Sequence, residues 1–184
     1  MLIILDRDGV INQDSPDFIK SPDEFIFLSG SVEAIVKLSQ AGHRIGVASN
    51  QSGIARGHLT EETLQTIHRK MISAVQQYGG VLNDIAYCPH APDVDCMCRK
   101  PKPGMLIAIA DKYKVNYHDI IFVGDRLSDI QAAEAIGAQP ILVRSTATEP
   151  DVGDFYPKIS EFDALLAFAD KFLDRCFLNG NFKE

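Results

Sequence analysis

Two pairs of aspartates stand where buried strands are expected to end. Asp6 and Asp8 follow the apolar run Leu2 to Leu5 in DRDG, and Asp125 and Asp129 follow a second apolar run in GDRLSD. Either motif alone could be a solvated turn, since aspartate and glycine favour turns. Carboxylates that converge on one pocket are costly unless a divalent cation compensates them, and Mg²⁺ prefers a few protein oxygens with water and phosphate oxygens. The two pairs together therefore predict a site for magnesium and phosphate.

Two further segments carry groups suited to holding a phosphate. The run SNQSG, residues 49–53, offers a hydroxyl, side-chain amides and exposed backbone N–H groups, which bind phosphate without adding charge. Lys100 lies among prolines in RKPKPG, where the restricted backbone could fix its ammonium group in a pocket. Taken alone, the first segment could be an ordinary polar turn and the second a basic surface patch.

A cluster of metal-ligand residue types precedes Lys100. Cys88, His90, Cys96 and Cys98 lie within eleven residues, whereas Cys176 stands alone and is expected to pack as a small apolar residue. Three thiolates and one imidazole suit a closed tetrahedral Zn²⁺ site with no open position for substrate. The alternative is reduced cysteines in a mobile loop with a chance histidine. The spacing favours a structural zinc site.

Alternating strands and helices must position these groups. Short apolar runs predict strands at residues 2–5, 44–48, 84–87, 120–123 and 141–143. Helical periodicity predicts helices at 31–40, 60–78, 105–113, 128–136 and 160–173, with Ser31, Thr60 and Ser128 as N-terminal caps and an irregular segment at 145–157. The pattern predicts an α/β fold with a doubly wound parallel sheet, whose ligands bind beyond the carboxyl ends of the strands.

Composition limits the remaining possibilities. The chain has 184 residues, 46% of them hydrophobic and 23% charged, which predicts a single domain over 1–184. A formal net charge of −7 argues against nucleic-acid and anionic-membrane partners. The start MLIILDRDG is too short for the apolar core of a signal peptide, and no run approaches membrane-spanning length. We therefore expect a cytoplasmic protein, and a monomer.

The four motifs, in order and spacing, resemble the haloacid dehalogenase superfamily of phosphatases that use an aspartate nucleophile. More closely, DRDGVIN, SNQSGIARG, CPH with CMCRKPKPGM, and GDRLSDIQAA resemble the group of D-glycero-D-manno-heptose 1,7-bisphosphate 7-phosphatases and histidinol-phosphate phosphatases. The resemblance covers most of the chain. It implies a Rossmann-like fold with a minimal cap and a zinc-stapled loop.

The resemblance also implies a role for each catalytic residue. Asp6 would attack phosphorus and form an aspartyl-phosphate, while Asp8 would protonate the leaving oxygen and later activate water. Ser49 and Lys100 would hold the transferring phosphoryl group. An anionic nucleophile must approach an anionic phosphate, so a cation beside it is a physical necessity.

Metal and substrate contacts follow from the same resemblance. Mg²⁺ would bind the Asp6 carboxylate, the Asp8 carbonyl and Asp125, with Asp129 supporting the site. Zn²⁺ would bind Cys88, His90, Cys96 and Cys98. The residues expected to contact substrate are Asp14, Ser15, Pro16, Asp17, Asn50, Gln51, Ser52, Arg99 and Arg126.

Four functions remain open at this point. The leading interpretation is a sugar-phosphate phosphatase that removes the 7-phosphate of heptose 1,7-bisphosphate during synthesis of lipopolysaccharide or another surface glycan. Histidinol-phosphate phosphatase is the nearest alternative, because the catalytic residues would be shared. A non-catalytic phosphate-binding or zinc-stabilised module, and a nucleic-acid end phosphatase, are weaker alternatives. Val10, Ser49 and Arg126 replace the Thr, Thr and Lys common in the group, and these departures concern the substrate rather than the reaction.

Overall fold

Six parallel strands form one sheet in the computed structural model, which describes the backbone of residues 1–178 and the side chains of residues 1–175. The spatial order is β3-β2-β1-β4-β5-β6. The strands are β1 (Leu2–Leu5), β2 (Arg44–Asn50), β3 (Asp84–Cys88), β4 (Ile120–Gly124), β5 (Gln139–Val143) and β6 (Ser160–Phe162).

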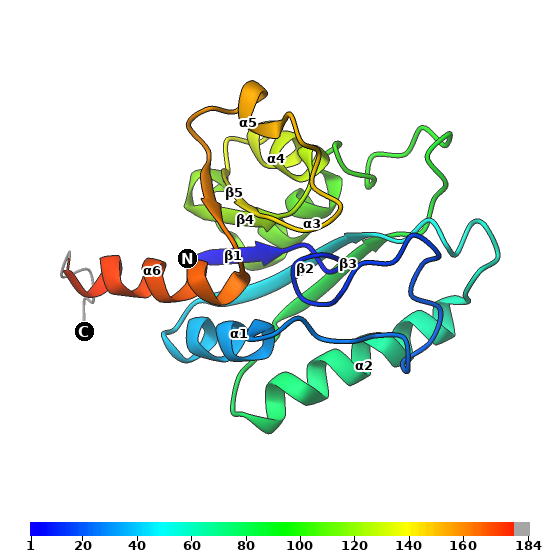
Figure 1. Cartoon of the computed structure of the whole chain (residues 1–184), viewed down its shortest axis with the longest axis horizontal. Helices are drawn as coiled ribbons and strands as arrows, with labels where there is room; N and C mark the ends of the chain where they lie inside the picture. Colours follow the sequence, from blue (N-terminus) through cyan, green and yellow to red (C-terminus); the bar gives the residue numbers. More distant parts are fainter. Residues whose placement is uncertain (179–184) are drawn as a thin grey trace.

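Helices cover both faces of this sheet. α1, α2 and α6 lie on one face, and α3 and α4 lie on the other (Figure 1). The helices are α1 (Ser31–Gln40), α2 (Glu61–Gln77), α3 (Gly104–Tyr113), the 3-10 turn η1 (Tyr117–Asp119), α4 (Leu127–Glu134), α5 (Val152–Phe155) and α6 (Leu165–Leu178). The doubly wound α/β sheet predicted from the sequence is confirmed.

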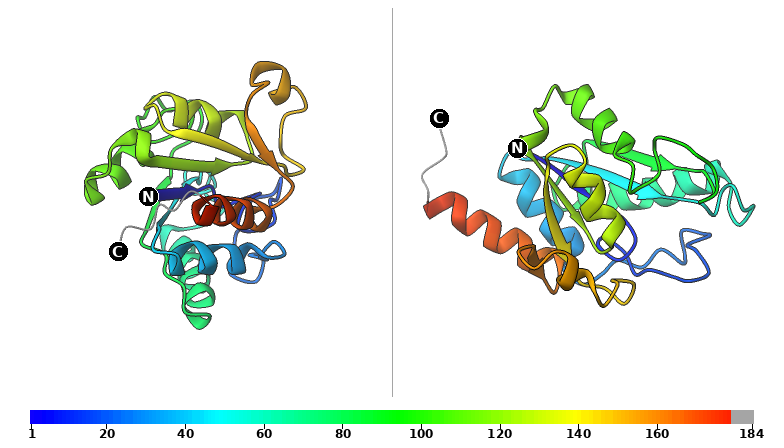
Figure 2. Two further views of the ribbon diagram at one scale, coloured as in Figure 1. Left: turned by 90° about the vertical axis from the view of Figure 1, so that its left-hand side faces the viewer. Right: turned by 90° about the horizontal axis from the view of Figure 1, so that it is seen from above.

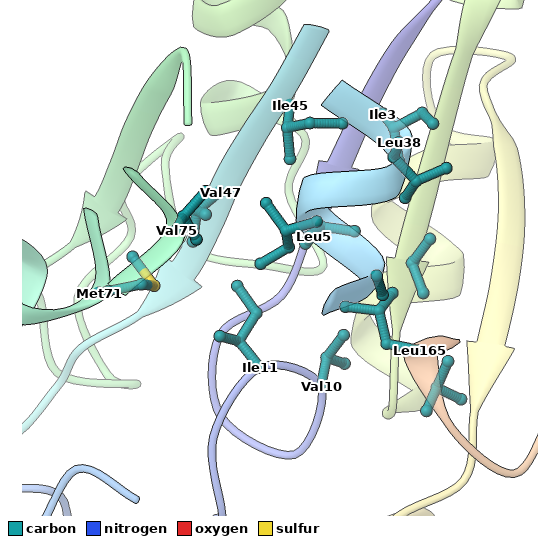
Figure 3. Packing of buried hydrophobic residues seen from close by; sticks show 14 of the residues in the cluster. Ile3, Leu5, Val10, Ile11, Leu38, Ile45, Val47, Met71, Val75 and Leu165 are labelled. Atoms are coloured by element: carbon teal, nitrogen blue, oxygen red, sulfur yellow. The ribbon is translucent and has the colours of Figure 1, made fainter. Parts of the chain in front are cut away.

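The all-apolar β1 forms the centre of the core because both of its faces are covered. Leu2 and Ile4 point to the side of α3 and α4, and Ile3 and Leu5 point to the opposite side. Complete burial of one such side chain contributes roughly 1.5–3 kcal/mol to stability. Figure 3 shows Ile3 and Leu5 packed with residues of α1, α2 and α6, among them Leu38, Met71, Val75 and Leu165.

The strand order reverses at β1, which pairs with β2 on one side and with β4 on the other. Leu5 lies in register with Val47 of β2 and with Val123 of β4, so the chain leaves all three strands at the same edge of the sheet. The loops after β1, β2 and β3 gather at this end of the molecule, away from the N-terminus (Figures 1 and 2). A switch point of this kind is where doubly wound sheets bind ligands.

Two of the three predicted helix caps are wrong. Gly30 precedes α1 with a positive φ of 76°, and the hydroxyl of Ser31 is buried inside the first turn. At α4 the cap is made by Asp129, whose Oδ2 accepts the backbone N–H of Arg126 at 3.0 Å, so Ser128 is not the cap. The third cap is confirmed, because Thr60 Oγ1 accepts the N–H of Thr63 at 3.1 Å.

The region after β5 also differs from the prediction. The segment 160–173 begins with the edge strand β6, and the helix starts only at Leu165. A short helix, α5, interrupts the segment predicted to be irregular. The side chain of Cys176 lies outside the described residues. Within the described part of the chain, every helix is too short or too polar to cross a membrane.

Candidate active site

Three buried carboxylates meet at the switch point. Asp6 follows β1, Asp125 follows β4, and Asp129 lies in the first turn of α4; their candidate ligand oxygens lie within 4.8 Å of one another. Burial raises the pKa of Asp6 to about 7, although Lys100 opposes the shift. Burial and the charges of Asp6 and Asp129 raise the pKa of Asp125 to about 8. Oδ1 of Asp125 is buried without a hydrogen-bond partner among the described residues. These oxygens fit a divalent cation.

Gly9 is required by the approach of Asp125. Its φ is +84°, and a Cβ at this position would lie 2.2 Å from Oδ2 of Asp125. Any other residue would therefore strain the backbone and displace the carboxylate. This contact gives a physical reason for the glycine of the DRDG motif.

Lys100 supplies a buried positive charge beside Asp6. Its Nζ lies 2.8 Å from Oδ1 of Asp6 and 2.7 Å from Oδ1 of Asp129, and it donates to the carbonyl of Ala48 at 2.9 Å. The contact with Ala48 is a hydrogen bond, whereas the two carboxylates pair with the charge of the ammonium group. Burial opposes the charge, but Asp129 and Asp6 outweigh it and raise the pKa of Lys100. The lysine is therefore held as a cation beside the proposed nucleophile.

Asp8 is held by a buried arginine that the sequence analysis did not select. Nη2 of Arg7 binds both carboxylate oxygens of Asp8 at 2.8 Å, and Nδ2 of Asn12 donates to Oδ1 at 2.9 Å. Arg7 is 1% exposed, and its guanidinium lies over the ring of Phe25. Burial opposes ionisation of Asp8, but Arg7 outweighs it and lowers the pKa.

The loop after β2 joins the phosphate-binding groups to the rest of the site. Nε2 of Gln51 donates to Oγ of Ser49 at 2.7 Å and to Oδ2 of Asp8 at 2.9 Å. The side chain of Asn50 binds the backbone of Lys100 in both directions, donating to its carbonyl at 3.2 Å and accepting its N–H at 3.0 Å. The amides of Asn50, the last residue of β2, and of Gln51 thus fix Ser49, Asp8 and Lys100 relative to one another.

A cavity of about 430 Å³ opens above these groups. Residues of the loop after β1 and Arg99 of the cysteine loop line it together with the catalytic candidates. Nη2 of Arg126 lies 2.6 Å from Oδ2 of Asp14 at its rim. Of the nine expected substrate contacts, eight line the cavity; the exception among the described side chains is Asp17, which is exposed. Asp125 and Asp129 lie buried beneath it.

The predicted zinc ligands converge in the loop after β3. Cys88, His90, Cys96 and Cys98 place Sγ and Nδ1 atoms 3.2 to 3.6 Å apart. Donors of a tetrahedral zinc site with bonds of about 2.0–2.3 Å lie about 3.5–3.8 Å apart. Burial opposes ionisation of Cys96, but the backbone N–H of Arg99 and the neighbouring side chains lower its pKa to about 6. The set fits a closed zinc site next to Lys100.

Known proteins match most of this chain. A family model described as HAD-hydrolase-like matches residues 97–161. The D-glycero-β-D-manno-heptose-1,7-bisphosphate 7-phosphatase of Pseudomonas putida is 48% identical over 169 residues, which cover 91% of this chain and 97% of that protein. The enzyme of the same name from Bordetella bronchiseptica is 54% identical over 78% of this chain and 80% of its own length. The chain belongs to the family of heptose-1,7-bisphosphate 7-phosphatases.

Solved structures of this heptose bisphosphate phosphatase family share the fold. The Bordetella bronchiseptica D,D-heptose 1,7-bisphosphate phosphatase, crystallised with magnesium and phosphate, matches with a TM-score of 0.90 and 46% identity over 95% of this chain and 98% of that one. The Burkholderia thailandensis phosphatase matches with a TM-score of 0.66 and 35% identity over 94% and 97% of the two chains.

The polar loop after β5 also contributes to the site, although its sequence was not selected as functional. After β5, Oγ of Ser145 donates to Oδ2 of Asp125 at 2.5 Å, and Oγ1 of Thr148 donates to the Asp125 carbonyl at 2.6 Å. Oε2 of Glu149 accepts the N–H of Leu127 at 3.0 Å. These residues follow a strand that pairs with β4, so the same rule of polar strand ends could have selected them.

Proposed function

We propose that the chain hydrolyses the 7-phosphate ester of D-glycero-β-D-manno-heptose 1,7-bisphosphate, in the synthesis of heptose precursors of lipopolysaccharide or a related surface glycan. The observation that carries this proposal is Lys100 at 2.8 Å from Asp6, above a cluster of buried carboxylates, in a chain 48% identical to an enzyme of that name. The arrangement suits attack on a phosphate, because the cation offsets repulsion between the nucleophile and an anionic substrate.

In the first step, an oxygen of Asp6 attacks the 7-phosphorus in line. The P–O bond to the sugar breaks and its electron pair goes to the sugar oxygen, which takes a proton from Asp8. Arg7 lowers the pKa of Asp8 in this structure, so Asp8 would take up that proton when the anionic substrate binds beside it and raises its pKa. The backbone N–H of Arg7 at 2.7 Å and Lys100 both bind Oδ1 of Asp6, so Oδ2 is the oxygen that these two groups do not engage. We assign Oδ2 as the attacking atom.

In the second step, water attacks the phosphorus of the aspartyl-phosphate. The Asp8 carboxylate takes a proton from this water, the bond from phosphorus to Asp6 breaks, and its electron pair returns to the Asp6 carboxylate. Ser49 and Lys100 hold the phosphoryl oxygens in both steps. The enzyme therefore ends each cycle with inorganic phosphate, the heptose 1-phosphate and Asp6 restored.

Asp6, the Asp8 carbonyl and Asp125 would hold Mg²⁺, which when bound stabilises the negative charge on the phosphoryl oxygens. Asp129 supports this site through Lys100, which it contacts at 2.7 Å. The crystallised Bordetella bronchiseptica relative carries magnesium together with phosphate. Ser145 binds Oδ2 of Asp125. Oδ1 has no hydrogen-bond partner among the described residues, so it would be the oxygen available to the cation.

Arg99 and Arg126 would bind the second phosphate of the substrate. Both line the cavity, Arg99 from the cysteine loop and Arg126 from the start of α4. Arg126 pairs with Asp14 at 2.6 Å, and an anionic group in the cavity would compete for the same guanidinium. Two arginines at the rim favour a substrate that carries a second negative charge.

The cysteine loop would carry a structural Zn²⁺ that fixes Arg99 and Lys100. These two residues directly follow Cys98, and the carbonyl of Met97 accepts the N–H of Gly104 at the start of α3. The loop is therefore tied to a helix on one side of Lys100 and to the ligand cluster on the other. We further propose that the chain acts in the cytoplasm as a monomer, with one domain built on its single six-stranded sheet.

Phosphate release with Mg²⁺ tests this function. Heptose 1,7-bisphosphate in both anomers and histidinol phosphate would be compared side by side, with Asp6→Asn as the blank. We expect kcat/KM to favour the bisphosphate by more than about tenfold, a difference of about 1.4 kcal/mol. A preference for histidinol phosphate would move the chain to histidine synthesis. Absence of Asp6-dependent release from every substrate would favour a non-catalytic phosphate-binding module.

A further inference from the structure

The side chain of Gln51 connects two parts of the site that have different roles. Its single nitrogen, Nε2, donates to Oγ of Ser49 at 2.7 Å and to Oδ2 of Asp8 at 2.9 Å. Ser49 is 1% exposed and Gln51 is 6% exposed, so the hydrogen bond between them is buried, while the bond from Gln51 to Asp8 is partly buried at the wall of the cavity. Ser49 lies near the end of β2 and holds the phosphoryl group in the proposed mechanism, whereas Asp8 follows β1 and serves as acid and base.

This geometry argues against a direct contact between the Gln51 amino group and substrate. A side-chain amide carries two N–H donors, and in this structure both point at protein acceptors. The backbone of Gln51 is also engaged, since its N–H donates to the carbonyl of Cys88 at 2.7 Å. Gln51 is therefore anchored at both ends, and its amide is placed to orient other groups.

The orientation of Asp8 matters because the leaving oxygen has a fixed position. Ser49 and Lys100 fix the phosphorus, and the leaving oxygen is bonded to that phosphorus. Arg7 and Asn12 anchor Oδ1 of Asp8, while Gln51 and Arg7 anchor Oδ2, so the donors together set the rotation of the carboxyl group. A displacement of about 1 Å at such a group can cost about a hundredfold in rate.

We propose that Gln51 is a positioning residue that aligns Asp8 with the leaving oxygen by bridging it to Ser49. Because Gln51 binds the hydroxyl of Ser49, which also binds the phosphoryl group, it holds the Asp8 carboxyl at a fixed distance from the bound phosphate. Without the bridge, Asp8 keeps its contacts with Arg7 and Asn12 but is no longer tied to the phosphoryl site. This inference rests on the proposed function, because it assigns a role in that reaction.

A comparison of leaving groups tests the proposal. The 7-oxygen of heptose 1,7-bisphosphate needs a proton as it leaves, whereas the oxygen of p-nitrophenyl phosphate leaves readily as an anion. In Gln51→Met, which keeps the chain length but has no donor, we expect kcat/KM for the bisphosphate to fall by about 30- to 100-fold. For p-nitrophenyl phosphate we expect a fall of less than about fivefold, since protonation contributes little there. The quantity kcat/KM reports the steps up to loss of the leaving group.

Ser52→Ala is the matched control. Ser52 lines the same cavity from the same loop, and among the described residues its side chain makes no hydrogen bond to Asp8. Loss of a contact with the sugar would also spare p-nitrophenyl phosphate, so phenyl phosphate, which has the same ring but a poorer leaving group, is compared as well. Ser52→Ala should lower kcat/KM by a similar factor for the two aryl phosphates, whereas Gln51→Met should lower it more for phenyl phosphate. An equal fall for the two aryl phosphates in Gln51→Met, or no fall in either, would overturn the assignment of Gln51.

A second variant covers the case in which Gln51→Met does not fold. Gln51→Asn keeps an amide but is one methylene shorter, so it cannot span Ser49 and Asp8, and the same split between substrates is expected. Thermal unfolding of each variant, with and without Mg²⁺, verifies that the fold is intact. If the wild-type enzyme releases phosphate from neither substrate, the proposed function fails; if the wild-type is active and the split is absent, only the role of Gln51 fails.

Discussion

Nζ of Lys100 lies 2.8 Å from Oδ1 of Asp6, so a cation from the loop after β3 reaches a carboxylate at the end of β1. The same ammonium lies 2.7 Å from Oδ1 of Asp129 and donates to the carbonyl of Ala48 at 2.9 Å. One buried charge therefore joins the end of β1, the first turn of α4 and the backbone of β2. The same ion pairs that stabilise the buried carboxylates therefore also keep a positive charge beside the proposed nucleophile, Asp6.

Replacement of this lysine should abolish most of the turnover. In Lys100→Met we expect kcat to fall by at least about 10²- to 10³-fold, because a preorganised charge at the phosphoryl group is lost. Lys100→Arg should not restore activity, since a larger planar guanidinium cannot occupy the buried space that the compact ammonium shares with the oxygens of Asp6, Asp129 and Ala48. Steady-state phosphate release measures both variants. Activity of Lys100→Arg near the wild-type value would contradict this role.

A pair of glycine variants should separate crowding from backbone strain. Gly9 and Gly42 both have a φ of +84°, but a Cβ on Gly9 would meet Oδ2 of Asp125 at 2.2 Å, whereas nothing lies within 4 Å of one on Gly42. Gly42→Ala should therefore cost only about 1 kcal/mol of stability. Gly9→Ala should in addition weaken Mg²⁺ binding by more than about tenfold, because Asp125 is displaced. Titration calorimetry with Mg²⁺ measures the difference, and equal affinities would refute it.

Removal of zinc should disturb the active site as well as the fold. We expect Cys96→Ser to lose its zinc, to melt at a lower temperature, and to lose kcat/KM because Arg99 and Lys100 are misplaced. Met97→Ser is the matched control, since Met97 is an exposed side chain between two of the ligands. Metal analysis, thermal unfolding and phosphate release cover the three effects. A zinc-free Cys96→Ser variant with full activity and stability would exclude the coupling.

His68 should make the protein less stable in mild acid. The side chain lies in α2 against Tyr87 and is 3% exposed. Burial, with the nearby charge of Arg7, lowers the pKa of His68 from 6.5 to about 4. Between these values the unfolded chain binds a proton that the folded protein does not, so the free energy of unfolding falls as the pH falls from 6.5 toward 4.

The size of this effect can be measured against a variant without the titrating group. Protonation of His68 in the unfolded chain should lower the free energy of unfolding by about 2–3 kcal/mol between neutral pH and about pH 4.5. Urea unfolding of the wild-type protein and of His68→Gln over this range isolates the contribution, because the other titrating groups are common to both proteins. Parallel curves for the two proteins would show that His68 does not titrate as expected.

The strand ends were predictable because buried strands leave a strong local signal. The apolar runs before Asp6 and Asp125 indicate central strands of a parallel sheet, and the structure places both aspartates at the switch point. The sixth strand, Ser160–Phe162, was missed because three residues give too little alternation to distinguish a strand from the start of a helix.

Arg7 and Ser145 were missed for another reason, since their roles depend on tertiary contacts. A single arginine between two aspartates would ordinarily be exposed, yet Arg7 is 1% exposed and clamps Asp8. Ser145 reaches Asp125 only because β5 pairs with β4. The cap of α4 is a similar case, because serine and aspartate are both good capping residues and the local sequence does not distinguish Ser128 from Asp129. In the structure Asp129 makes the cap and also binds Lys100.

The most direct test is to trap the phosphorylated enzyme. Wild-type protein and Asp6→Asn would be mixed with Mg²⁺ and heptose 1,7-bisphosphate labelled at the 7-phosphate, and quenched in acid at a series of early times. We expect labelled wild-type protein whose label is released by hydroxylamine, as an acyl phosphate requires, and maps to the peptide that contains Asp6; Asp6→Asn should carry none. Release of phosphate by the wild-type enzyme with no label above the Asp6→Asn blank at any time, or with the label on another residue, would contradict Asp6 as the nucleophile.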